Sequence, residues 1–238
     1  MTLREARTSR GGILYDPDLL VTVDPSLFDP ETWRARGALT GTGGGRGTVH
    51  YLEADAAQWV LRRYRRGGVV GRWVDESFIY YGAERTRSYR EITLLADLYA
   101  RGLPVPRPIA AHYHRIDVRY TADLITERVA AEPLSSWLAR GPVDEPVWRE
   151  IGDMIARFHR AGVWHADLTA HNILLEARGV PWLLDFDRGR IRPPGAWRER
   201  NLARLLRSLR KIRPDVSEGN YPDPQWHWLL AGYAASVA

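Results

Sequence analysis

The sequence predicts an α+β fold in which a β-rich N-terminal half precedes a mainly helical C-terminal half. Strand-like apolar segments and a glycine-rich turn dominate the chain before residue 127. Two long amphipathic helix patterns, at residues 143–162 and 196–212, follow after that point. The 238 residues, of which 45% are hydrophobic and 26% charged, are enough for one large domain or two small lobes.

The first 128 residues are expected to form a leader and a β-rich lobe. Residues 1–37 contain three Asp-Pro turns and indicate an irregular leader that packs on this lobe. Residues 38–68 predict a hairpin with a glycine-rich tip, and the stretch "QWVLRRY" within them is a strand. The N-terminal lobe should therefore cover residues 38–128, and a second lobe residues 129–238.

A helix and two more strands complete the predicted N-terminal lobe. The helix covers "SYREITLLADLYARG", with Ser88 as its N-cap, Glu91 three residues later and Gly102 at its end. The prolines of "LPVPRP" then favour extended chain. Residues 111–129 offer two strands, and the second of them ends near Glu127.

The predicted C-terminal lobe begins with a helix at residues 143–162. Its apolar side chains fall on one stripe, formed by Val147, Ile151, Met154, Ile155 and Phe158. The polar stretch "GVWHADLTAHNILL" comes next, followed by "PWLLDFDRGR", a short apolar strand that ends in two aspartates. Residues 196–212 form a basic amphipathic helix, in which Leu202, Leu205, Leu206, Leu209 and Ile212 share a stripe. That stripe could dock at a membrane interface, but the pattern favours an ordinary core-facing helix with its charges in water.

Composition and charge exclude several classes of protein. The absence of cysteine excludes disulfides, thiolate metal sites and a cysteine nucleophile. No signal peptide is predicted, and no apolar run approaches the ~20 residues of a membrane span. The net charge of +5 rests almost entirely on arginine, which forms bidentate contacts with phosphate or carboxylate, so we expect an anionic partner. No motif indicates nucleic-acid binding.

The polar stretch at residues 162–175 is either a solvated turn or a functional site. Asp167 and Asn172 stand five residues apart, and Asp185 follows thirteen residues after the asparagine. Phosphoryl transfer needs a base or orienter for the attacking hydroxyl and hard oxygen ligands for Mg²⁺. Asp167 would take the first role, while Asn172 and Asp185 would hold the metal. His165 would stand behind them and hold the loop through backbone hydrogen bonds.

This pattern resembles the catalytic loop and the magnesium-binding triplet of protein kinases, carried here by "HADLTAHN" and "DFD". The resemblance implies a bilobal kinase-like fold with ATP as phosphate donor and Mg²⁺ as cofactor. Ala166 stands where such loops carry arginine, and no Ala-Pro-Glu follows Asp187. These departures make regulation by loop phosphorylation and a protein substrate doubtful, and they favour a small or lipid-linked acceptor.

The same resemblance implies further parts in the N-terminal lobe, which would cover ATP. The glycine-rich stretch 41–48 would lie over the phosphates through Gly44, Gly45 and Gly47, unless it is only a flexible hairpin. Arg62 would replace the usual strand lysine, with Arg63 or Arg65 as alternates, or it is a solvated strand end. Glu91 would pair with that cation, unless it serves only a capping box with Ser88. Glu127 would meet adenine at the lobe junction, or it merely ends a strand.

Stretches along most of the chain resemble the 3-deoxy-D-manno-octulosonic acid (Kdo) kinases of lipopolysaccharide assembly in Gram-negative bacteria. They are "LYDP", "GGRGT", "VLRRYRRGG", "GLPVPRPIAA", "GVWHADLTAHNILL", "LLDFDRGR" and "NLARLLRSLRK". The resemblance implies phosphorylation of the Kdo 4-OH on a Kdo-bearing lipid A precursor, by a peripheral protein at the cytoplasmic face of the inner membrane. An anionic membrane surface would suit the arginines.

Two other functions remain open from the sequence. The chain could phosphorylate another small molecule, such as lipopolysaccharide heptose or an aminoglycoside. It could also be a non-catalytic kinase-like binding module, which the missing strand lysine favours and the retained Asp167, Asn172 and Asp185 disfavour.

Overall fold

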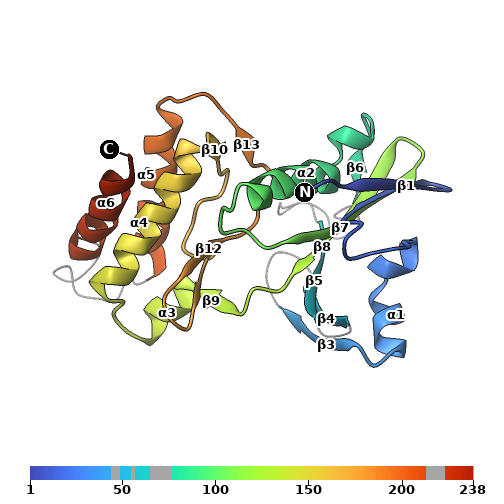
Figure 1. The fold of residues 1–238 in the computed structure, drawn as a ribbon, viewed down its shortest axis with the longest axis horizontal. Coiled ribbons are helices and arrows are strands. Elements are labelled where there is room, and N and C mark those ends of the chain that lie inside the picture. Colours follow the sequence, from blue (N-terminus) through green and yellow to red (C-terminus); the bar gives the residue numbers. More distant parts are fainter. Residues whose placement is uncertain (44–48, 55–56, 65–76, 213–222, 238) are drawn as a thin grey trace. The chain divides into compact units, whose positions relative to one another are not determined.

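The chain divides into two compact units in the computed structural model, which describes residues 1–43, 49–54, 57–64, 77–212 and 223–237. Unit 1 comprises residues 1–101 and 106–129, and unit 2 comprises residues 102–105 and 130–238. Unit 1 is rich in strands and unit 2 is mainly helical (Figure 1), which confirms the predicted α+β class.

Unit 1 is built on one antiparallel sheet (Figure 1). Its strands are β1 (Arg4–Thr8), β2 (Gly11–Tyr15), β3 (Leu39–Gly43), β4 (Val49–Ala54), β5 (Ala57–Arg63), β6 (Phe78–Ile79), β7 (Pro108–Ile116) and β8 (Arg119–Glu127). They lie in the order β1-β2-β7-β8-β5-β4-β3, and β6 pairs with β8. The strands predicted within residues 38–68 and 111–129 are confirmed, including the end of β8 at Glu127.

The prediction of an irregular leader is wrong for residues 4–15. These residues form β1 and β2, and β2 pairs with β7, so the segment is part of the sheet. The segment "REART" has a single apolar residue and shows no alternation, because the strand it forms is a largely exposed edge. Further on, two of the Asp-Pro pairs start helices, η1 (Pro25–Phe28) and α1 (Pro30–Ala35), whose first backbone N–H groups the aspartates cap.

The two faces of β5 carry different side chains, because successive residues of a strand point to opposite sides. The odd-numbered Trp59 and Leu61 join a core with Phe28 and Trp33 from η1 and α1. The even-numbered Arg62 points to the opposite face, where it meets helix α2 (Arg87–Ala100). This alternation decides which arginine of the strand reaches the helix.

Helix α2 differs from its prediction at the N-terminus. Its N-cap is Thr86, preceded by η2 (Ala83–Arg85), and no side chain caps the first turn. Ser88 instead donates its hydroxyl to the His112 carbonyl of β7 at 2.8 Å, so the predicted capping box is wrong. The C-terminal prediction is confirmed, since Gly102 follows the helix with φ +68°, a left-handed conformation that ends helices.

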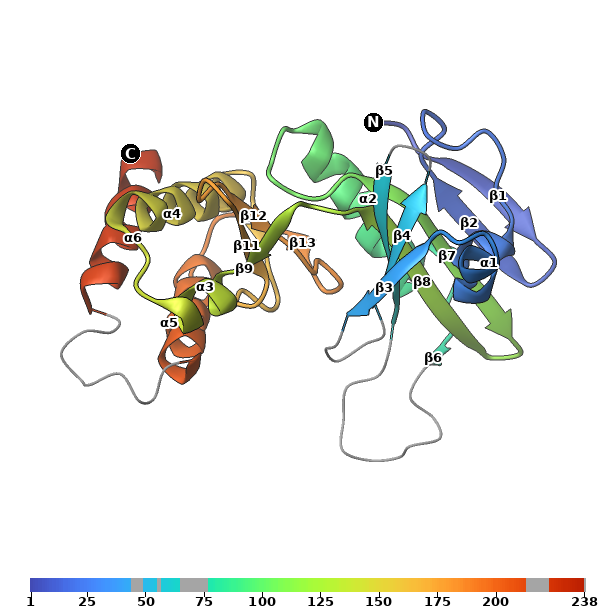
Figure 2. The ribbon, with the colours of Figure 1, turned by 90° about the horizontal axis from the view of Figure 1, so that it is seen from below.

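Unit 2 combines four helices with short strands within its described residues (Figures 1 and 2). Its elements are β9 (Ala131–Pro133), α3 (Leu134–Arg140), α4 (Glu145–Arg160), β10 (Val163–Trp164), β11 (Ile173–Glu176), β12 (Pro181–Leu183), β13 (Arg190–Ile191), α5 (Trp197–Ile212) and α6 (Asp223–Val237). The strands form a three-stranded sheet, β12-β11-β9, and a small β10-β13 pair. Helices α4 and α5 confirm the two helix predictions, whereas α3 and α6 were not predicted.

Helix α4 buries four of the five residues of its predicted stripe, with Val147 half-buried, whereas α5 buries two of five, with Leu202, Leu206 and Ile212 half-buried. Ile151, Met154, Ile155 and Phe158 of α4 are in the core, and α6 runs alongside this helix (Figures 1 and 2). In α5 the buried residues include Leu205 and Leu209, so these leucines belong to the core and are not available to a membrane.

Candidate active site

The spacing of the polar residues in unit 2 is explained by a hairpin. Strands β11 and β12 are antiparallel partners, with Ile173 opposite Leu183. One step further, the Leu184 N–H donates to the Asn172 carbonyl at 2.9 Å. The twelve residues between Asn172 and Asp185 therefore fold back, and the two predicted metal ligands emerge at the same end of the hairpin.

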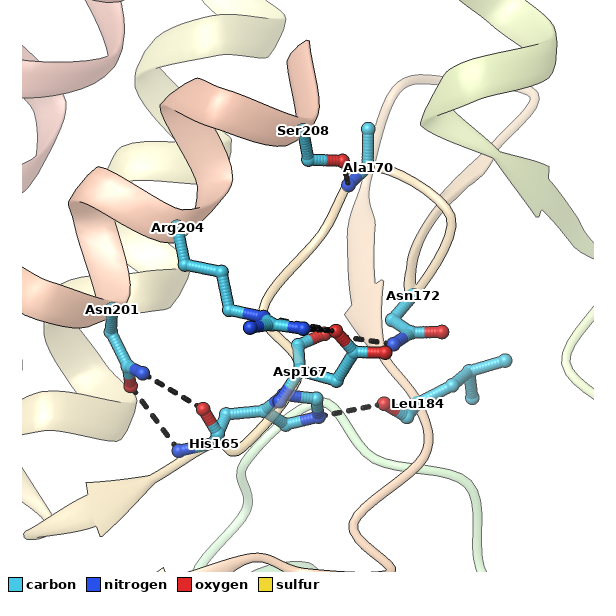
Figure 3. Close-up of polar contacts among 8 residues, drawn as sticks. All are labelled: His165, Asp167, Ala170, Asn172, Leu184, Asn201, Arg204 and Ser208. Carbon is cyan, nitrogen blue, oxygen red and sulfur yellow. Dashed lines mark hydrogen bonds and ion pairs between the residues drawn. The ribbon is translucent and has the colours of Figure 1, made fainter. Parts of the chain in front are cut away.

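His165 connects the loop at Asp167 with the strand end at Leu184, and its side chain is buried. Its Nδ1 accepts the backbone N–H of Asp167 at 3.2 Å, and its Nε2 lies 2.8 Å from the Leu184 carbonyl (Figure 3). Nε2 must therefore carry the proton and donate it, which defines one neutral tautomer. Burial lowers the pKa of His165, consistent with an uncharged ring. The ring thus holds the backbone of Asp167 next to the residue that precedes Asp185.

Asn172 is oriented in a way that suits an oxygen ligand for a metal. Its Nδ2 donates to the Asp167 carbonyl at 2.8 Å, so its Oδ1 is the atom left for another partner (Figure 3). Asp185 has φ +64°, a left-handed conformation that costs energy for any residue with a side chain and is often kept at functional positions. One amide oxygen and one carboxylate fit Mg²⁺, which keeps water and phosphate oxygens as its other ligands.

The described residues contain no cluster of three or more His, Cys, Asp or Glu side chains able to hold a metal by themselves. Magnesium sites in phosphoryl-transfer enzymes commonly use one or two protein ligands together with water and phosphate oxygens.

Helix α5 contributes three contacts to the loop that the sequence did not predict (Figure 3). Asn201 is buried, and its side chain accepts the His165 N–H at 3.2 Å and donates to the His165 carbonyl at 2.8 Å. The Ala170 N–H donates to the Ser208 hydroxyl at 3.2 Å. Arg204 forms an ion pair with the Asp167 carboxylate, with its Nε 2.9 Å from Oδ1. The available signal was the spacing of polar residues at 201, 204 and 208, which places them on one helix face.

In unit 1 the predicted cation and its predicted partner form a partly buried ion pair. Arg62 Nη2 lies 2.6 Å from Glu91 Oε2, and the Tyr64 hydroxyl donates to the same oxygen at 2.5 Å. Glu91 is only 2% exposed, whereas the arginine side chain is 25% exposed. The guanidinium also lies over the Tyr64 ring, 4.8 Å from its centroid. The exposed part of the Arg62 side chain can thus reach a ligand while Glu91 holds the guanidinium in place.

The alternates to Arg62 have different positions. Arg63 lies on the other face of β5, where its Nε is 2.8 Å from Asp123 Oδ1. Arg65 lies outside the described residues, as do Gly44, Gly45 and Gly47. Glu127 is exposed at the end of β8, and its backbone N–H donates to the Arg107 carbonyl at 2.8 Å.

Known proteins resemble this chain over most of its length. Residues 30–233 match the family model described as the lipopolysaccharide kinase (Kdo/WaaP) family. A protein of Xylella fastidiosa (strain 9a5c) named 3-deoxy-D-manno-octulosonic acid kinase is 48% identical over 208 residues, which cover 87% of this chain and 83% of that protein. A protein of the same name from Stenotrophomonas maltophilia (strain K279a) is 46% identical over 210 residues, again covering 87% and 83%.

A solved structure supports the fold. The structure titled "Co-crystal structure of WbdD and kinase inhibitor LY294002" matches with a TM-score of 0.52 and 16% sequence identity. The match covers 83% of this chain and 45% of that one, so this chain spans less than half of that protein. The fold is therefore the bilobal protein-kinase-like fold predicted from the sequence. The chain belongs to the lipopolysaccharide kinase (Kdo/WaaP) family and is a phosphotransferase whose acceptor is an alcohol group.

Proposed function

We propose that the chain phosphorylates the 4-OH of Kdo on a Kdo-bearing lipid A precursor, using ATP and Mg²⁺, during assembly of the lipopolysaccharide inner core. The family match and the names of the relatives support a Kdo acceptor. The observation that carries the chemistry is the arrangement around His165, which fixes Asp167 and the segment leading to Asp185 relative to each other.

Asp167 is the base in the proposed reaction. As the acceptor oxygen attacks the γ-phosphorus of ATP, a new P–O bond forms and the bond from that phosphorus to the β–γ bridging oxygen breaks. The hydroxyl proton passes to the Asp167 carboxylate, and the products are ADP and the sugar phosphate. Asn172 and Asp185 would hold Mg²⁺, which neutralises charge on the transferring phosphate when it is bound. His165 touches no reacting atom and positions the loop.

The nucleotide would be held by residues of unit 1. Arg62, anchored by Glu91, is proposed to contact the ATP phosphates, in the role that lysine has in most kinases. Glycines 44, 45 and 47 are proposed to cover those phosphates, and Glu127 to lie near adenine. The ion pair between Arg62 and Glu91 removes the main argument for a non-catalytic module, because a suitable cation is present and anchored.

The acceptor lipid implies work at an anionic membrane surface, and we propose the cytoplasmic face of the inner membrane. Among the residues that the structure describes, none of the helices is long and apolar enough to cross a bilayer. We propose that attachment is peripheral. Exposed basic residues of α5, namely Arg200, Arg207, Arg210 and Lys211, are proposed to meet lipid headgroups.

Transfer of labelled phosphate from ATP tests this function. With Mg²⁺ present, the Kdo-bearing precursor should be labelled, and the same precursor without Kdo should not. The position of the phosphate on the product, read by NMR, tests the 4-OH assignment. Asp167→Asn should fold normally and lose at least about 10²-fold in kcat, the usual contribution of a general base. Label on another sugar or small molecule alone would instead favour a kinase of different specificity, and normal turnover by Asp167→Asn would refute the mechanism.

A further inference from the structure

The positive charge beside Asp167 comes from helix α5. The loop from Val163 to Asn172 contains no lysine or arginine. Arg204, which projects from α5 onto this loop, supplies the charge instead (Figure 3). The other two polar residues on the same helix face, Asn201 and Ser208, hydrogen-bond to the backbone of the loop, whereas Arg204 contacts the side chain of Asp167.

The geometry of this ion pair uses one edge of the guanidinium. Nε and Nη2 of Arg204 both donate to Oδ1 of Asp167. Among the described residues no partner contacts Nη1, and the side chain is 45% exposed. A guanidinium has five N–H donors in a planar fork, so its outer edge can bind a second anion while its inner edge stays on Asp167. Because Arg204 occupies Oδ1 of Asp167, Oδ2 is the oxygen that can accept a hydroxyl proton.

We propose that the outer edge of Arg204 binds the carboxylate of the acceptor and thereby sets specificity for an acidic sugar. This inference rests on the proposed function, in which the acceptor is a Kdo residue. Kdo is a 3-deoxy-octulosonic acid, so its carboxyl carbon C1 is attached to C2, and only the methylene C3 separates C2 from the carbon that bears the 4-OH. A single arginine that contacts both Asp167 and the sugar carboxylate would align this hydroxyl with the base.

The arrangement explains why arginine suits this position better than lysine. A lysine ammonium is a point charge without two flat edges, and it cannot form parallel hydrogen bonds to two carboxylates in one plane. Asp167 would hold the guanidinium in place before the acceptor arrives, so little side-chain entropy is lost on binding. Arg204 is then a specificity-determining residue that also orients the base.

The test compares two acceptors, the Kdo-bearing lipid A precursor and the same molecule with its Kdo carboxylate converted to a carboxamide. We expect wild-type kcat/KM to fall about 10- to 100-fold with the amide, as for the loss of one charged hydrogen-bonding pair. In Arg204→Gln, activity on the acid should fall by at least that factor, and the ratio between the two acceptors should approach 1. Arg204→Lys should give an intermediate ratio.

Controls separate this inference from the proposed function and from misfolding. Arg178→Gln removes the same charge from the exposed turn between β11 and β12 and should keep the wild-type ratio. If Arg204→Gln lowers activity on both acceptors equally and keeps the wild-type ratio, Arg204 acts only on Asp167 and the carboxylate contact is refuted. Should that variant not fold, as judged by circular dichroism, an unchanged ratio in Arg204→Lys refutes it equally. If the wild-type protein labels no Kdo acceptor, the proposed function is refuted, and this inference is refuted with it.

Discussion

Replacing Asn201 by leucine tests how strongly α5 holds the catalytic loop. The change keeps the number and branching of the side-chain heavy atoms but removes both hydrogen bonds to the His165 backbone, one accepted at 3.2 Å and one donated at 2.8 Å. Both backbone groups lie in a buried environment, and an unsatisfied buried group costs about 1–3 kcal/mol. The free energy of unfolding should therefore fall by about 2–5 kcal/mol, a large part of the ~5–15 kcal/mol typical of a folded protein.

Urea unfolding followed by tryptophan fluorescence measures this loss, with kcat measured on the same preparations. Ser208→Ala, which removes a single hydrogen bond to Ala170, should cost about 1 kcal/mol. Arg207→Gln, an exposed change on the same helix, should stay within about 0.5 kcal/mol of the wild type. If Asn201→Leu shows the wild-type urea midpoint and slope, the two hydrogen bonds do not hold the loop, and the role assigned to α5 is wrong.

Three further predictions follow from buried groups. Arg62→Ala removes the ion pair with the buried Glu91, so it should cost about 3–5 kcal/mol in urea unfolding and raise the KM for ATP. Arg62→Lys should recover most of the stability, and an unchanged KM in both variants would move the phosphate contact elsewhere. Burial lowers the pKa of His159 from 6.5 to about 4, so the unfolded chain takes up a proton that the native state excludes. Stability should be complete above pH 6.5 and fall by about 3 kcal/mol towards pH 4, and urea midpoints that stay flat over this range would contradict it. Gly152→Ala places a methyl group 2.0 Å from the Leu229 carbonyl oxygen of α6. The thermal midpoint should therefore fall by an amount that corresponds to a free-energy loss of at least about 3 kcal/mol. An unchanged midpoint would show that α4 and α6 move apart easily.

The sequence predicts the local geometry of the proposed catalytic motif well, because that geometry depends on residues close together in the chain. His165, Asp167 and Asn172 lie in one loop, and the spacing to Asp185 matches a hairpin that pairs with itself. Such relations can be read from a single stretch of chain. The strand period likewise places Arg62 on one face of β5, although only the structure shows that Arg62 pairs with Glu91 and Arg63 with Asp123.

The contacts that the sequence misses all depend on distant partners. Strands β1 and β2 form because β2 pairs with β7, about a hundred residues later in the chain, and β1 pairs with β2. Ser88 has the sequence position of an N-cap, yet its hydroxyl donates to the His112 carbonyl of β7. Arg204 resembles the other exposed arginines of its helix, and only the tertiary fold distinguishes it by bringing Asp167 within reach. Long-range pairing overrides local propensity in each case.

The dependence of the loop on α5 also bears on biosynthesis. Domains fold as their residues leave the ribosome, N-terminal parts first. All the motif residues, up to Asp185, emerge before Asn201, Arg204 and Ser208, so a nascent chain carries the complete motif before α5 can brace it. We therefore expect a fragment that ends near residue 195, which contains every motif residue but lacks α5, to be inactive.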